Sequence, residues 1–319
     1  MRVVVIGGTG HIGTYLIPML VADGHHVVNV SRAERQPYMV HAAWRDVEQV
    51  RADREAEDAA GTFGRRVRDL RPDIVVDLIC FTESSARQLV EALRGQVQHF
   101  LHCGTIWIYG HSTQVPATED QPRRPFGDYG IQKAAIEAYL LNEARRNGFP
   151  ATCLHPGHIV GPGWHPLNPQ GNFNLGVFDT LARGDELTLP NLGLETVHHV
   201  HAADVAQAFM RAIACWSASV GQSFHTVSPA ALTLRGYAEA VAGWFGQEAR
   251  LRFMPWDEWR TTVSEADARA TWDHIAHSPN ASIARAQRMI GYEPRYSSLE
   301  SVREALDWLI AQGEISADA

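Results

Sequence analysis

Short apolar runs alternate with stretches of helical spacing through the first half of the chain. Five runs, at residues 2–6, 27–30, 74–79, 99–103 and 151–155, are rich in Val, Ile and Leu with little alternation. This is typical of parallel strands buried on both faces, and a weaker strand is predicted at 47–50. Between the runs, apolar residues recur at helical spacing in segments 12–22, 61–70, 84–93 and 129–146. The alternation predicts an α/β fold built on a doubly wound parallel sheet.

The pattern changes after about residue 160. Segments 161–166 and 168–174 are rich in Gly, Pro and Asn, which indicates long loops. Further helices are predicted at 202–214, 234–244 and 299–310, and a strand at 221–227. We expect residues 161–319 to complete the sheet that residues 1–160 begin, and to add a small C-terminal substrate-binding lobe, interleaved in one structural unit.

A glycine-rich segment joins the first strand to the first helix. Residues 7–13 read GGTGHIG, so glycines at 7 or 8, at 10 and at 13 fit the dinucleotide-binding spacing. The chemistry needs a tight turn, a backbone that approaches a pyrophosphate without Cβ atoms, and a helix N-terminus aimed at the charge. The preceding strand and following helix supply that context, so we predict a Rossmann-type core that binds a nicotinamide dinucleotide.

The end of the second strand indicates which dinucleotide binds. A carboxylate about 20 residues after the glycine loop holds the ribose 2′-hydroxyl of NAD. The chain has Ser31 and Arg32 there instead, a hydroxyl donor and a planar cation that suit a 2′-phosphate. NADP is therefore favoured over NAD.

Composition excludes several classes of protein. The 319 residues are 45% hydrophobic with a net charge of −8, which gives no electrostatic footprint for nucleic acid. No apolar run is long enough to span a membrane, and no secretory signal precedes the first strand. The four cysteines form no CxxC pair, and the sixteen histidines show no zinc-binding spacing. We expect a cytoplasmic protein with reduced thiols and no metal, nucleic-acid or membrane partner.

The chain has 27 arginines and a single lysine, Lys133. Lys133 follows Tyr129 by four positions in a predicted helix, so the two side chains share a face. An ammonium group can stabilise a phenolate and lower the pKa of a tyrosine from about 10. Its compact head can also reach ribose hydroxyls in a geometry that a guanidinium does not offer. The sole lysine therefore indicates a chemical role for this pair.

With these motifs, the chain resembles the extended short-chain dehydrogenase/reductases of the NAD-dependent epimerase/dehydratase type. The matching segments follow the family's order along nearly the whole chain: the glycine loop, 103–110 (CGTIWIYG), Tyr129 to Lys133 with Glu137 after them, 155–163 (HPGHIVGPG), 200–206 (VHAADVA) and 289–294 (MIGYEP).

The resemblance implies roles for individual residues. Thr105 would donate a hydrogen bond to the reacting carbonyl oxygen, Tyr129 would be the general acid/base, and Lys133 would be its electrostatic partner and ribose anchor. Asp53 matches the carboxylate that contacts adenine, and Pro156 matches the segment beside the nicotinamide. The candidate cofactor-binding residues are Gly7, Gly10, Ile12, Gly13, Ser31, Arg32, Asp53, Tyr129, Lys133 and Pro156.

Two departures concern the substrate. The family's nucleotide-sugar enzymes usually carry an arginine for the substrate's diphosphate at the position of Val197, and a second arginine is replaced by His155. The expected cleft walls are aromatic and polar, which suits a smaller, uncharged, hydroxylated molecule. The candidate wall residues are Phe81, Trp107, His111, His158, Trp164, Asn172 and Phe173.

The sequence therefore predicts an NADP- or NAD-dependent oxidoreductase or epimerase that transfers hydride at a secondary alcohol or ketone of a small sugar-like substrate. A nucleotide-sugar 4-epimerase is one alternative, and a non-catalytic NADP-binding regulator is another. The resemblance also implies a homodimer, formed through the helix that carries Tyr129 and Lys133 and the helix before it.

Overall fold

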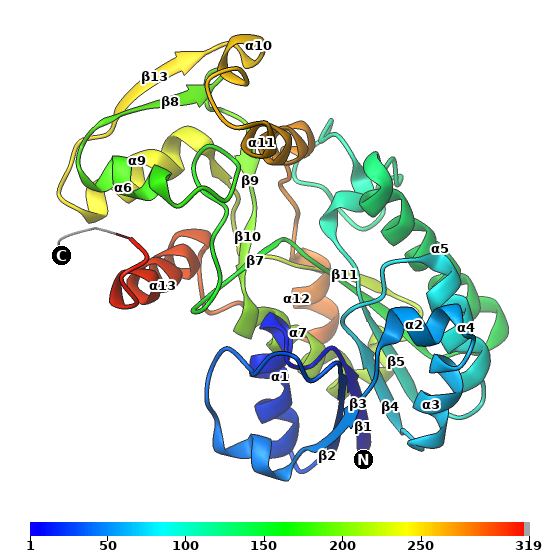
Figure 1. The fold of residues 1–319 in the computed structure, drawn as a ribbon. Coiled ribbons are helices and arrows are strands. Elements are labelled where there is room, and N and C mark those ends of the chain that lie inside the picture. Colours follow the sequence, from blue (N-terminus) through cyan, green and yellow to red (C-terminus); the bar gives the residue numbers. More distant parts are fainter. Residues whose placement is uncertain (316–319) are drawn as a thin grey trace.

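Seven parallel strands form the centre of the computed structural model, which describes residues 1–315 (Figure 1). Their order across the sheet is β11-β6-β5-β4-β1-β2-β3. The strands are β1 (Arg2–Ile6), β2 (His26–Ser31), β3 (Glu48–Arg51), β4 (Ile74–Asp77), β5 (His99–Cys103), β6 (Ala151–Pro156) and β11 (Ser223–Thr226). The predicted doubly wound α/β fold is confirmed, and each predicted strand overlaps an observed one.

Helices cover both faces of the sheet, which explains the continuous apolar strands (Figure 1). On one face, α1 (His11–Ala22), α7 (Ala202–Ala214) and α12 (Ala284–Ile290) contribute Leu16, Phe209 and Ile290 to one apolar core. On the other face, α3 (Phe63–Asp69), α4 (Glu83–Leu93) and α5 (Gly127–Asn147) contribute Phe63, Leu89 and Leu140 to a second. Each face therefore buries its own helical layer.

The order of the strands reverses between β1 and β4. From β1 the chain proceeds outward to β2 and β3, whereas β4, β5 and β6 extend the sheet in the opposite direction. In open parallel sheets, ligands bind at the carboxyl ends of the strands beside such a reversal. The glycine loop follows β1 at this point, so the topology places the candidate site there.

A smaller lobe covers this end of the sheet (Figure 1). It contains three two-stranded sheets, and a third apolar core that includes Phe178, Tyr237 and Leu306. Its strands pair β7 (His158–Val160) with β10 (His199–His201), β8 (Glu186–Pro190) with β13 (Arg250–Met254), and β9 (Thr196–Val197) with β12 (Leu232–Thr233). Its helices include α6 (Gly176–Ala182), α9 (Leu234–Trp244), α10 (Trp256–Trp259), α11 (Glu265–His277) and α13 (Ser298–Ala311).

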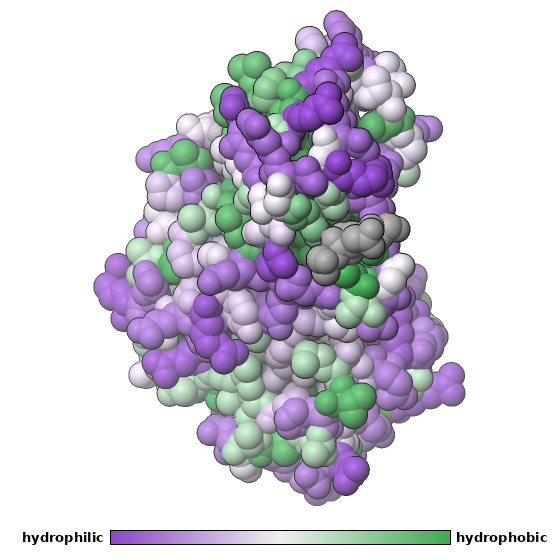
Figure 2. Space-filling model, turned by 90° about the vertical axis from the view of Figure 1, so that its left-hand side faces the viewer, coloured by the Kyte–Doolittle hydropathy of each residue, from purple (hydrophilic) through white to green (hydrophobic). Residues whose placement is uncertain are grey.

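The face drawn in Figure 2 intersperses hydrophilic and hydrophobic residues. In the described part of the chain, no helix is both long and apolar enough to cross a bilayer. Nor does any group of three or more His, Cys, Asp or Glu side chains between residues 1 and 315 have the geometry to hold a metal ion.

Candidate active site

The glycine loop turns tightly between β1 and α1. Gly7 has a positive φ of 85°, and the Gly10 amide donates to the Gly7 carbonyl at 3.1 Å. A Cβ atom on Gly13 would lie 2.1 Å from the Gly8 carbonyl oxygen, so only glycine lets α1 approach the loop this closely. These are the close approaches that a pyrophosphate-binding turn requires.

Asn29, which the sequence analysis did not single out, holds this loop from below. It is fully buried on β2, and its Oδ1 accepts a hydrogen bond from the Gly8 amide at 3.0 Å. Its Nδ2 donates to Gln49 Oε1 on β3 at 2.8 Å. A buried asparagine inside a strand of valines was the available signal, because a buried polar group needs partners.

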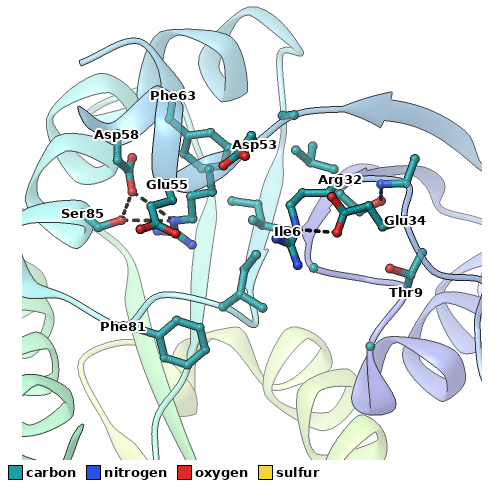
Figure 3. Close-up of a pocket in the computed structure, with 18 of the residues that line it drawn as sticks. Ile6, Thr9, Arg32, Glu34, Asp53, Glu55, Asp58, Phe63, Phe81 and Ser85 are labelled. Carbon is teal, nitrogen blue, oxygen red and sulfur yellow. Dashed lines mark hydrogen bonds and ion pairs between the residues drawn. The ribbon is translucent and has the colours of Figure 1, made fainter. Parts of the chain in front are cut away.

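A cavity of about 680 Å³ opens above the glycine loop (Figure 3). It brings together Gly7, Gly10, Ser31, Arg32 and Asp53, five of the candidate cofactor residues. Asp53 also caps α2 (Arg54–Ala59), since its carboxylate accepts a hydrogen bond from the Ala56 amide at 3.1 Å. The volume of this cavity lies within the range of small-molecule and cofactor sites.

The rim of this cavity carries mixed charges. Arg32 forms an ion pair with Glu34, with 3.3 Å between Nε and Oε2, and both side chains are more than half exposed (Figure 3). Ser31 Oγ accepts a hydrogen bond from the Ala33 amide at 3.2 Å, which leaves its own proton free to donate. Arg35 lines the same cavity.

A buried ionic network closes the opposite wall. Arg54 binds Asp77 at the end of β4 with two hydrogen bonds of 2.5 and 3.0 Å. It also donates to Ser85 Oγ at 3.1 Å and pairs with Asp58 at 3.3 Å. This network was not predicted from the sequence, because Arg54 lies in a segment dense with surface-like charges. Figure 3 shows Asp58 and Ser85 across the cavity from Arg32.

A second cavity of about 500 Å³ adjoins the first, and Phe81 lines both. It is bounded by Thr105, Tyr129 and Lys133 on one side and by side chains of the small lobe on the other. The candidate residues that line it also include Ile12, Phe81, Trp107, Pro156, His158, Trp164 and Phe173.

Two expected wall residues lie elsewhere. Asn172 is fully buried and donates to Thr271 Oγ1 at 3.1 Å, so it holds its own loop against α11. His111 contacts the Ala276 carbonyl and stacks on Phe126, outside the lining of the cavity. Asn172 lies in a loop rich in glycine and asparagine, which fixes no side-chain direction from sequence.

Thr105 lies two residues after the end of β5 and caps the short 3₁₀ helix η2 (Ile106–Tyr109). Its Oγ1 accepts a hydrogen bond from the Trp107 amide at 3.3 Å, and the side chain lies close enough to the Tyr129 hydroxyl to lower its pKa. The hydroxyl groups of Thr105 and Tyr129 therefore meet at the wall of the second cavity.

Lys133 is almost completely buried, with 2% of its surface exposed. Its Nζ donates to the carbonyls of Cys80 and Cys103, which follow β4 and end β5, at 2.8 and 2.7 Å. An ammonium group has three donors, so one remains for a ligand. Burial lowers the pKa of Lys133.

The predicted lowering of the tyrosine pKa is not found in this structure. Desolvation raises the pKa of Tyr129 to about 12, although 44% of the residue remains exposed, and the nearby Thr105 hydroxyl offsets only part of that effect. Lys133 Nζ lies 5.8 Å from the centre of the Tyr129 ring, and its donors point to the strand-end carbonyls. At neutral pH the phenol is therefore protonated and placed to act as an acid.

Comparison of the sequence with known protein families identifies the family of this chain. Residues 3–224 match the NAD dependent epimerase/dehydratase family. The chain belongs to this family. The match confirms the resemblance on which the residue roles depend.

Individual members of the epimerase/dehydratase family are similar over different lengths. UDP-glucose 4-epimerase of Mycolicibacterium smegmatis is 26% identical over 335 residues, which cover 97% of this chain and 98% of that protein. The 2′-dehydrokanamycin reductase of Streptomyces kanamyceticus is 34% identical over 137 residues, 43% of this chain and 37% of that one.

Among solved structures, UDP-glucose 4-epimerase from Thermotoga maritima superposes with a TM-score of 0.74 at 20% identity, covering 98% of this chain and 99% of that one. At 20% identity this similarity concerns the fold, which the two chains share over nearly their whole length.

Proposed function

We propose that this protein catalyses reversible hydride transfer between NADP(H) and a secondary alcohol or ketone of a small, hydroxylated, sugar-like substrate. The observation that carries the proposal is the meeting of Thr105, Tyr129 and Lys133 at one wall of a cavity that adjoins the glycine loop. A nicotinamide dinucleotide would supply the hydride or accept it.

The chain's own residues would handle the proton and the developing charge. Tyr129 is protonated at neutral pH, since burial raises its pKa to about 12, and it would donate to the carbonyl oxygen during reduction. The Thr105 hydroxyl, which lies close to Tyr129, would hold the same oxygen. Lys133 keeps one donor free for the cofactor ribose.

The glycine loop fits the cofactor's pyrophosphate. A Cβ atom added to Gly10 would meet one heavy atom within 4 Å, the Gly7 carbonyl oxygen at 3.3 Å, so space remains above this residue at the N-terminus of α1. Gly7 and Gly10 would form the cradle, Gly13 would let α1 approach it closely, Ile12 and Pro156 would lie on the nicotinamide side, and Asp53 near adenine.

The charge of the second cavity supports a substrate without a diphosphate. Among the described residues that line it there is no arginine, and Val197 lies in its wall. Lys133 is its one ammonium group, and burial lowers the pKa of its three lining histidines, His158, His198 and His274. We infer a neutral or weakly polar substrate bound by Phe81, Trp107, His158 and Trp164.

A nucleotide-sugar 4-epimerase is the second candidate, because the relative from M. smegmatis with that activity is similar along the whole chain. Activity assays distinguish the two candidate functions. The protein is incubated with NADPH and a panel of uncharged keto sugars while the absorbance of the reduced nicotinamide is followed, and with NAD and UDP-glucose while UDP-galactose is assayed. Reduction of a keto sugar supports the proposal, and epimerisation of UDP-glucose alone overturns it.

We propose NADP as the preferred cofactor on the strength of Ser31, Arg32 and Arg35 at the ribose end of the first cavity. The ion pair between Arg32 and Glu34 is exposed, and such pairs contribute only about 0–1 kcal/mol, so a 2′-phosphate can compete with Glu34 for Arg32.

The cofactor proposal predicts that Arg32→Ala weakens NADPH binding about 10-fold, because one charge-assisted contact is lost, and leaves NADH binding unchanged. Arg183→Ala is the matched control, since Arg183 forms a similar exposed pair with Asp185, outside the lining of both cavities. Equal affinities of the wild type for NADPH and NADH in a fluorescence titration would rule out the preference.

We also propose a homodimer through α4 and α5, a cytoplasmic location in keeping with four free cysteines, and the division into residues 1–160 and 161–319. A monomeric mass by light scattering at micromolar concentration would reject the dimer.

A further inference from the structure

The hydrogen-bond ladder between β5 and β6 ends in a side chain. The Gly104 amide donates to the Leu154 carbonyl at 2.7 Å, which continues the ladder one residue beyond β5. The next amide, that of Thr105, donates to Nδ1 of His155 at 3.1 Å. His155 lies on β6 and is fully buried, so this contact sits beneath the floor of the candidate site.

The contact fixes the tautomer of His155. A backbone N–H can only donate, so Nδ1 is unprotonated and the neutral ring carries its proton on Nε2. Nε2 lies 3.0 Å from Glu137 Oε1, where that proton is accepted. Arg123 holds the same carboxylate through two hydrogen bonds of 2.8 and 2.6 Å. A buried chain thus leads from Arg123 through Glu137 and His155 to the Thr105 amide.

Gly104 has no Cβ atom and so leaves room for the imidazole ring of His155. A Cβ atom at residue 104 would lie 2.2 Å from His155 Nδ1, closer than any side-chain atom can approach. The ring is therefore wedged against the backbone directly before Thr105. Thr105 is held in an extended conformation, with φ −163° and ψ 150°, and its side chain lies close to the Tyr129 hydroxyl.

We propose that His155 is a positioning residue: its Nδ1 holds the Thr105 backbone so that the Thr105 hydroxyl meets the reacting oxygen. The proposal rests on the proposed function, in which Thr105 and Tyr129 contact that oxygen. Glu137 and Arg123 act through His155 by keeping its proton on Nε2. Misplacing a reacting group by about 1 Å can cost on the order of 100-fold in rate, so one hydrogen bond to the backbone matters here.

Two isosteric variants separate the roles of the ring nitrogens. In His155→Asn, the amide oxygen takes the place of Nδ1 and can still accept from Thr105, while the contact with Glu137 is lost. In His155→Gln, the amide reaches the place of Nε2 and bonds with Glu137, while Thr105 loses its acceptor. We expect kcat to fall roughly 10- to 100-fold in the Gln variant and less than about 5-fold in the Asn variant.

Two further readouts exclude a merely structural role. The dissociation constant for NADPH should stay within about 2-fold of wild type in both variants, because the lost bond acts on the transition state alone. Hydrogen exchange of the Thr105 amide should accelerate in the Gln variant and remain slow in the Asn variant. If both variants lose kcat in proportion to their loss of unfolding free energy, or if exchange at Thr105 is the same in both, the proposal is overturned.

Glu137→Gln covers the case in which His155→Gln does not fold. An amide in place of the carboxylate no longer dictates which ring nitrogen carries the proton, so kcat should fall several-fold and the Thr105 amide should exchange faster. Unchanged kcat and unchanged exchange would contradict the proposal. If wild type reduces no ketone, the proposed function fails, while the exchange experiment still decides whether His155 holds Thr105.

Discussion

Lys133 shows how one residue can carry both structure and chemistry. It is the only lysine of the chain, and it lies buried under the site with two of its three donors bound to the carbonyls of Cys80 and Cys103. The Cys80 carbonyl follows β4, and the Cys103 carbonyl ends the neighbouring strand β5. The ammonium group therefore joins two strand ends in addition to any role toward the cofactor.

Replacing this residue tests both roles. Lys133→Arg keeps the charge, but a planar guanidinium cannot reproduce the compact geometry of the ammonium. We expect turnover to fall roughly 100-fold, the scale of losing a positioned acid/base group. We also expect a lower melting temperature, because the larger side chain enters a closely packed site. Wild-type turnover, NADPH affinity and melting temperature in this variant would contradict both roles.

The sequence could identify Lys133 but not its surroundings. Spacing placed it on the same helix face as Tyr129, and the structure has both on α5. Burial was not foreseeable, because the carbonyls that bind Lys133 come from segments 30 and 53 residues away in sequence. The expected lowering of the Tyr129 pKa failed for the same reason: burial depends on the whole fold, and it raises that pKa to about 12.

At the scale of elements, the strand–loop–helix unit of β1, the glycine loop and α1 was readable from sequence because its physics is local. Apolar strand, glycine spacing and helix follow one another without interruption, and β1 has the predicted bounds. The small lobe was less predictable. Its strands β8 and β13 pair across more than 60 residues, and α11 was not predicted, although it contributes His274 to the second cavity.

The same unit provides an element-scale prediction. Gly13→Ala places a Cβ atom 2.1 Å from the Gly8 carbonyl oxygen, so α1 must move away from the loop. Overpacking of this kind costs about 1–3 kcal/mol of unfolding free energy. The affinity for NADPH, measured by calorimetry, should fall at least 10-fold, which is roughly the effect of losing one strong contact.

Gly243→Ala is the control for this prediction. Gly243 lies in α9, and a Cβ atom there meets no other atom within 4 Å. Alanine is the better helix former, so this variant should gain about 0.5–1 kcal/mol and bind NADPH normally. Equal NADPH affinities of the Gly13 and Gly243 variants would show that the glycine loop does not hold the cofactor.

At the scale of the whole molecule, the histidines make stability depend on pH. Burial lowers the pKa of ten of the sixteen histidines well below the ordinary 6.5. These are His11, His99, His102, His158, His198, His199, His201, His225, His274 and His277. Below pH 6.5 the unfolded chain binds protons at these residues that the folded chain does not bind, so stability falls.

We therefore expect the unfolding free energy to be greatest above about pH 6.5 and to fall as the pH is lowered from 7 to 5. Denaturant titrations at several pH values measure this loss. His102→Leu provides the control, since both ring nitrogens of His102 are buried without a hydrogen-bond partner in the described structure. That variant should lose less stability on acidification, and a pH-independent wild type would contradict the account.

The most direct test of the proposed chemistry compares two tyrosines of α5. Tyr129 contacts Thr105 in the second cavity, whereas Tyr139 lies on the same helix outside both cavities and packs against Arg87. With NADPH and any keto sugar that wild type reduces, the initial rate of nicotinamide oxidation is measured for Tyr129→Phe and Tyr139→Phe. The account predicts that Tyr129→Phe lowers kcat roughly 100-fold or more while binding NADPH normally, and that Tyr139→Phe retains wild-type kcat. A Tyr129→Phe variant that reduces the ketone at the wild-type rate would contradict it.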